Sequence, residues 1–120
     1  MITNNRYIND LNTLVTGGEK DISVAGLEGA ARAYFAAGLL LEQEKPFLII
    51  FPRARDAAGF MKELEFFLPK GFVAGDQSEK RLFDFPAYDI SPLTGLSPHR
   101  NIVNRRLQAL YALTSGKKPV

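Results

Sequence analysis

The stretch Pro46-Phe47-Leu48-Ile49-Ile50-Phe51-Pro52 decides the fold that we expect from this sequence. Its five central residues are all large and apolar, and a proline closes the run at each end. A short, continuous apolar run is typical of a β-strand that is covered on both faces, as in a parallel sheet. We therefore predict a buried strand over residues 47–51.

Helices are predicted on both sides of this strand. Residues 30–42 are rich in alanine and leucine and carry charge only near the ends, which indicates a largely buried helix. Residues 54–68 place their apolar side chains on one stripe and lead to Pro69, which predicts a second helix. That stripe consists of Ala57, Phe60, Met61, Leu64, Phe67 and Leu68.

The rest of the chain continues this alternation. We predict a helix over residues 5–15 that ends at the Gly17-Gly18 pair, short strands over 21–25 and 81–85, and a last helix that begins at Ser97-Pro98. Alternating strands and helices indicate a three-layer α/β domain with a parallel sheet. Because the last helix should lead into another strand, we expect residues 1–120 to form a single, truncated domain of a longer protein.

The composition excludes several classes of protein. The chain has 120 residues, of which 46% are hydrophobic and 23% charged, as in an ordinary globular domain rather than a disordered or collagen-like one. Its longest uncharged apolar run, residues 33–41, is too short for a bilayer, which needs about 20 residues. The absence of cysteine excludes disulfides, zinc–thiolate sites and cysteine nucleophiles, and it fits a cytoplasmic protein.

The turn before the second predicted helix resembles a phosphate-binding loop that has lost its chemistry. The working pattern is G-x-x-x-x-G-K-[ST]. Aligned on Gly26, with Gly29 among the variable positions, it meets Ala31, Arg32 and Ala33 at the positions of the second glycine, the lysine and the hydroxyl residue. We predict a degenerate loop that binds no nucleotide. An ordinary turn with glycines for tightness is the simpler interpretation.

Basic residues gather near the C-terminus. Between residues 90 and 120 there are five basic residues and no acidic one: Arg100, Arg105, Arg106, Lys117 and Lys118. Such a surface could face phosphate groups or an acidic neighbouring domain, or it could be a solvated helix face. On the last predicted helix we expect Leu107 and Leu110 on the buried side, which leaves at least one of Arg105 and Arg106 outward.

Three motifs resemble the N-terminal region of bacterial transcription-repair coupling factors (Mfd). They are Phe85-Pro86-Ala87-Tyr88-Asp89, then Leu96-Ser97-Pro98-His99, then Arg106-Leu107-Gln108-Ala109-Leu110-Tyr111. The family patterns are F-P-x-[WY]-[DE], [FL]-S-P-H and R-L-x-x-L-Y, and the family also has a worn phosphate loop. The resemblance covers about residues 20–118.

The resemblance implies a fold and a role. It implies a degenerate P-loop domain similar to the repair protein UvrB, which acts as a non-catalytic module without a cofactor and mainly contacts the rest of its own chain. The parent would be an ATP-dependent DNA translocase, with ATP and magnesium in its motor module. It would displace stalled RNA polymerase and recruit nucleotide excision repair proteins, and it would contact UvrA, RNA polymerase and double-stranded DNA.

Two alternatives stay open at this point. The chain could be a divergent nucleotide-binding domain that uses Arg32 on phosphate. It could instead bind DNA weakly through Arg100, Arg105 and Arg106, with an affinity that falls steeply as salt rises. The loop over residues 88–96 is shorter than the DNA-gripping hairpin of UvrB-like proteins, which disfavours a role in clamping damaged DNA.

Overall fold

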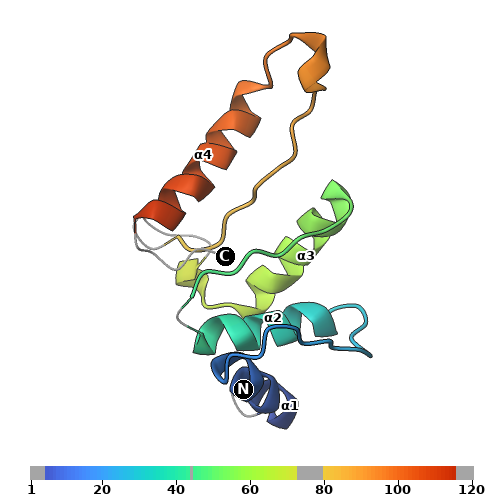
Figure 1. The fold of residues 1–120 in the computed structure, drawn as a ribbon, viewed down its shortest axis with the longest axis vertical. Helices are drawn as coiled ribbons and strands as arrows, with labels where there is room; N and C mark the ends of the chain where they lie inside the picture. Colours follow the sequence, from blue (N-terminus) through green and yellow to red (C-terminus); the bar gives the residue numbers. More distant parts are fainter. Residues whose placement is uncertain (1–4, 44, 73–79, 116–120) are drawn as a thin grey trace.

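The computed structural model describes residues 5–43, 45–72 and 80–115, and within these ranges the regular structure is helical. The α-helices are α1 (Arg6–Thr16), α2 (Ala31–Glu42), α3 (Ala54–Phe67) and α4 (Arg100–Thr114), and short 3₁₀ turns occur at Lys70–Phe72 and Pro92–Thr94. Helices α1, α2 and α3 lie together at one end of the molecule, whereas α4 and the chain that precedes it extend to the other end (Figure 1).

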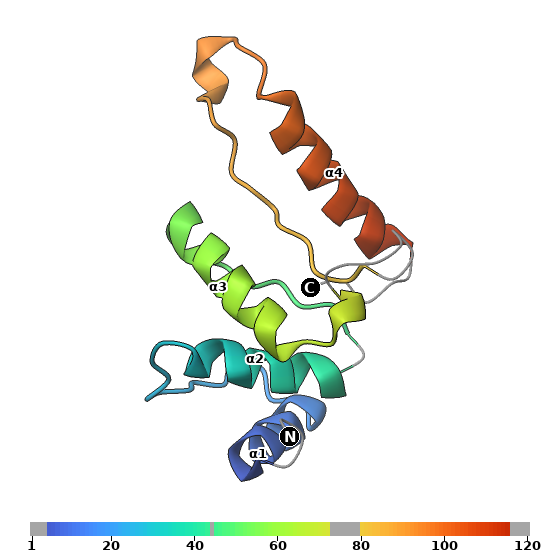
Figure 2. The same cartoon turned by 180° about the vertical axis from the view of Figure 1, so that it is seen from behind.

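The predicted α/β fold is wrong. No strand is present in the described ranges, and residues 21–25, 47–51 and 81–85 run as irregular chain between the helices (Figure 2). A strand exists only where a neighbouring strand supplies a ladder of N–H···O=C bonds. The apolar pattern predicted buried chain but supplied no such neighbour. Helices α2 and α3 instead pack directly on each other, so no sheet separates them into outer layers.

The segment that led to the α/β prediction is covered on one side only. Phe47 packs against the core, and the ring of Phe51 lies 5.0 Å from that of Phe60 on α3. The alternate side chains Leu48 and Ile50 are 77% and 81% exposed. The expectation of a segment covered on both faces is therefore also wrong.

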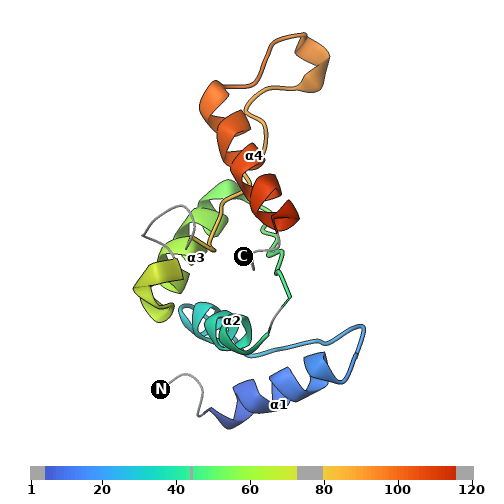
Figure 3. The same ribbon diagram turned by 90° about the vertical axis from the view of Figure 1, so that its left-hand side faces the viewer.

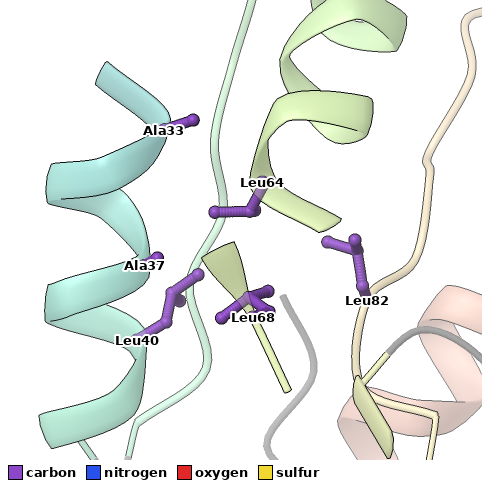
Figure 4. Packing of buried hydrophobic residues seen from close by; sticks show 6 residues of the cluster. All are labelled: Ala33, Ala37, Leu40, Leu64, Leu68 and Leu82. Atoms are coloured by element: carbon purple, nitrogen blue, oxygen red, sulfur yellow. The ribbon is translucent and has the colours of Figure 1, made fainter. Parts of the chain in front are cut away.

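The core lies between α2 and α3. Ala33 and Ala37 on α2 are fully buried, and Leu64 on α3 is 1% exposed (Figure 4). Small side chains on one helix allow the axis of the other to approach closely. The rings of Tyr34 and Phe67 meet edge to face at 5.5 Å across the same interface. The buried leucines Leu40, Leu68 and Leu82 complete the cluster.

Helix α1 packs on α2, and it has a cap at each end, of which the sequence predicted the glycine pair at the C-terminal end. The side-chain oxygen of Asn5 accepts hydrogen bonds from the amides of Tyr7 and Ile8, which caps the helix. Gly17 ends the helix, and Gly18 follows in the left-handed region at a φ of 82°. Ile8 is fully buried, and its burial joins α1 to the rest of the helical core.

The sequence placed the first three helices to within a residue or two, but it placed the start of α4 too early. We predicted a serine cap at Ser97 with Pro98 as the first helical residue. The helix begins at Arg100, and His99 is its N-cap, with Nδ1 accepting a hydrogen bond from the Asn101 amide at 3.2 Å. Gly116, the predicted C-terminal glycine of this helix, lies outside the described residues.

Residues 81–114 form an arm that projects from the helical core (Figure 3). The molecule measures 50 × 32 × 27 Å with a radius of gyration of 15.8 Å, against about 14 Å for a compact domain of this length. The arm joins the core where the amides of Arg81 and Leu82 both donate to the carbonyl of Phe72, and where the Leu82 side chain is buried.

We predict that the core depends on Leu64 much more than on its neighbour Phe66. Replacing Leu64 by alanine should lower the free energy of unfolding by about 2–5 kcal/mol, because it opens a cavity between α2 and α3. Phe66 is 84% exposed on the same helix, so Phe66→Ala should change it by no more than about 0.5 kcal/mol. Urea unfolding followed by circular dichroism measures both values. Equal losses would contradict this description of the core.

Candidate functional site

The turn that precedes α2 is built by glycine. Gly26 has a φ of 81° and Gly29 a φ of 53°. L-residues with a Cβ rarely adopt this left-handed region, so both positions favour glycine for the backbone shape alone. These are the two glycines that the sequence placed in the degenerate phosphate loop.

The amides at the start of α2 are occupied within the turn itself. The Ala31 amide donates to the carbonyl of Glu28 at 3.1 Å, and the Arg32 amide donates to the carbonyl of Gly29 at 3.4 Å. A phosphate loop needs the free N–H groups at its helix N-terminus to point at the ligand. Here two of the donors that would do so are engaged in closing the turn.

The three signature positions have different surroundings. Arg32 is exposed, and Ala31 is half-buried. Ala33, at the position of the magnesium-binding hydroxyl, is fully buried in the α2–α3 cluster (Figure 4). All three residues lie at the start of α2, and the structure gives Ala33 a packing role.

A second group of candidate residues lies on the arm, where both neighbouring arginines of α4 meet the chain that runs beside the helix. Arg105 forms an ion pair with Asp84 at 2.5 Å. The guanidinium of Arg106 donates to the carbonyl of Pro86 at 2.7 Å. It also lies between two rings, 4.0 Å from the centroid of Phe85 and 4.2 Å from that of Tyr88. We call Asp84, Phe85, Pro86, Tyr88, Arg105 and Arg106 the arginine clamp.

The loop between the clamp and α4 is tied at its base. The carboxylate of Asp89 accepts a hydrogen bond from the His99 amide at 3.2 Å, which closes the loop. At the tip, Ser91 accepts a bond from the Leu93 amide, and Gly95 turns the chain at a φ of 70°. Asp89 and Ser91 therefore both hold the loop through hydrogen bonds to backbone amides.

The structure separates the three arginines that were candidates for DNA contact. Arg105 and Arg106 both contact the preceding chain, whereas Arg100 is exposed in the first turn of α4. Lys117 and Lys118 lie outside the described residues. Two of the three arginines of the DNA-binding alternative thus already have partners within the chain.

The prediction for the buried face of α4 is wrong. Leu107 and Leu110 are 57% and 46% exposed, whereas Ala109 and Ala112 are buried. The chain that precedes α4 contacts the face that carries Arg106. Apolar periodicity alone could not identify this buried face, because a periodicity argument assigns leucines to the buried side before alanines or arginines.

Phe85 and Tyr88 are the clamp residues that sequence reasoning missed. They appeared only as letters of a family motif, and no local pattern links them to an arginine about twenty positions further on. They lie three positions apart, and alternation along an extended chain brings only residues two positions apart to the same side, so their spacing gave no signal either.

The described helices and side chains provide neither a metal cluster nor a membrane span. No group of three histidine, cysteine, aspartate or glutamate residues lies close enough to hold a metal within residues 5–43, 45–72 and 80–115. None of the helices described is long and apolar enough to cross a bilayer. His99 serves as the cap of α4.

The chain is similar to a transcription-repair-coupling factor from Rickettsia bellii (strain RML369-C). The two are 28% identical over 89 residues, which cover 73% of this chain and 7% of the relative. The chain thus spans a small part of that protein's length. This distant, partial match supports the resemblance in the motifs. No family model matches the chain, and no solved structure matches it.

We predict that the turn before α2 does not bind nucleotide. Isothermal titration with Mg-ATP should give no heat of binding. The amides of Ala31 and Arg32 already donate within the turn, and the loop lacks the lysine and the hydroxyl residue that bind phosphate and magnesium in a working loop. Arg32→Ala is the matched variant, since it removes the remaining positive charge of the loop. Micromolar binding by the natural chain that Arg32→Ala abolishes would overturn this prediction and establish a divergent nucleotide site.

Proposed function

We propose that the chain is a non-catalytic module of a protein that acts as a transcription-repair coupling factor. The observation that carries the proposal is the 89-residue match to such a factor. The three motifs that resemble the same family add to it, and two of them meet in the arginine clamp, where Phe85 and Tyr88 stack on Arg106.

The turn before α2 supports a non-catalytic role. Phosphoryl transfer depends on positioned cations and hydrogen-bond donors around the phosphate. At this turn the lysine and hydroxyl positions hold Arg32 and Ala33, and two helix amides are engaged in the turn. In our proposal, ATP and magnesium act in a motor module of the whole protein and not at this turn.

The activities of the whole protein belong to the same proposal. It would move along double-stranded DNA, displace stalled RNA polymerase and recruit repair proteins through UvrA. The described chain would serve mainly as a docking and structural unit within that protein. The exposed side chains Leu48 and Ile50 would contact other parts of it, since water is an unfavourable environment for large apolar groups.

The two alternatives have less support. A divergent nucleotide site using Arg32 would need the amides of Ala31 and Arg32, which donate within the turn. A DNA-binding surface on α4 would need Arg105 and Arg106, which are bound to Asp84 and Pro86. Neither alternative has an arrangement of side chains that favours it.

The role is tested by strand-specific repair in the host. We predict that disrupting the gene that encodes the chain slows removal of ultraviolet lesions from transcribed strands to the rate of non-transcribed strands. Complementation with the natural gene should restore the difference between strands, and a gene carrying Leu64→Ala should restore less of it, because the core is damaged. Phe66→Ala is the control and should restore it fully. Unchanged preference for the transcribed strand after disruption would refute the proposed role.

A further inference from the structure

Few apolar side chains of α4 are fully buried. Its buried residues are the small Ala109 and Ala112, Ile102 and Val103 are half-buried, and Leu107, Leu110 and Leu113 are about half exposed. Extensive contacts between helices join α1 to α2 and α2 to α3, and none of this extent involves α4. Because the hydrophobic contribution scales with the apolar area buried, burial alone does not account for the position of this helix.

Arg106 makes the most complete set of contacts between α4 and the chain beside it. Its guanidinium lies between the rings of Phe85 and Tyr88, and it donates to the carbonyl of Pro86. A planar guanidinium can stack on two rings through its faces and still donate a hydrogen bond through its edge, which a lysine cannot do.

The neighbouring ion pair contributes less. The side chains of Arg105 and Asp84 are 44% and 37% exposed. Water screens such a pair, and holding two long side chains in one geometry costs conformational entropy. The rings of Phe85 and Tyr88 are also 45% and 53% exposed, but the Arg106 guanidinium contacts both of them and the carbonyl of Pro86 at once, so the clamp depends more on Arg106 than on the ion pair.

We propose that Arg106 is the positioning residue that fixes α4 on residues 84–89. In this proposal α4 separates from residues 84–89 and returns to them while α1, α2 and α3 stay folded, and we call these two states the open and the closed arm. The loop over residues 90–98 moves with the arm, because the bond between Asp89 and the His99 amide ties its base to the clamp. In the closed arm the Arg106 guanidinium is held by the chain itself and is withheld from other ligands. The inference does not depend on the proposed function.

Hydrogen exchange of the intact chain, residue by residue, tests this inference. Arg106→Ala should speed exchange of the α4 amides by about tenfold, the change expected when the stabilisation by cation–π contacts of this kind is lost. Exchange of the α2 and α3 amides should stay unchanged. Alanine is the better helix former, so a weaker intrinsic helix cannot produce this result. Arg105→Ala should have a smaller effect on the same amides, since its ion pair is exposed.

Conservative variants separate stacking from charge and from general packing. Tyr88→Phe keeps the ring and should preserve protection of α4, whereas Tyr88→Leu should lose it. Arg106→Lys keeps the charge but not the plane, and should behave like Arg106→Ala. In nuclear magnetic resonance spectra, the Cδ protons of Arg106 should be shifted upfield by the two rings in the natural chain and in Tyr88→Phe, and should move back in Tyr88→Leu.

Three results would overturn the inference. The first is natural protection of α4 in Arg106→Lys, which would mean that charge alone suffices. The second is faster exchange in α2 and α3 to the same extent as in α4 after Arg106→Ala, which would make the arm and core one cooperative unit. The third is unchanged exchange of α4 in Arg106→Ala.

Discussion

The close contact of α2 with α3 is the constraint on which the rest of the structure depends. It requires small side chains on α2, and Ala33 and Ala37 supply them, both fully buried against Leu64 and Leu68. The same requirement places a methyl group at position 33, near the start of α2. A residue whose methyl group fills the core cannot also present a hydroxyl to magnesium, and a larger polar side chain there would have to be buried at a cost.

The arm is held by a different kind of interaction. A cation–π contact contributes about 0.5–1 kcal/mol at an exposed site and about 2 kcal/mol when shielded from water, whereas burying one leucine contributes about 1.5–3 kcal/mol. The two rings on Arg106 together thus compare with one buried leucine, which α4 lacks. The molecule is therefore a helical core stabilised by burial, joined at Leu82 to an arm stabilised by an arginine and its partners.

The sequence could predict the helices because their signals are local. The Gly17-Gly18 pair, the alanine- and leucine-rich residues 30–42 and the apolar stripe that includes Leu64 placed three helices well. The strands predicted over residues 21–25, 47–51 and 81–85 are wrong, because a strand needs a partner that a run of apolar residues does not specify. The glycines of the turn were recognised, but the burial of Ala33 depends on α3. The clamp could not be predicted, because it joins two segments about twenty residues apart that show no pattern in common.

The central claim is that α2 and α3 pack directly on each other and that Ala33 belongs to their core. Nuclear Overhauser contacts between side-chain methyl groups in the natural chain test it most directly. The account predicts contacts from the methyls of Ala33 and Ala37 to those of Leu64 and Leu68, and no cross-strand contacts among residues 21–25, 47–51 and 81–85. A ladder of backbone contacts between any two of those segments, with the methyl group of Ala33 free of contacts to α3, would contradict it.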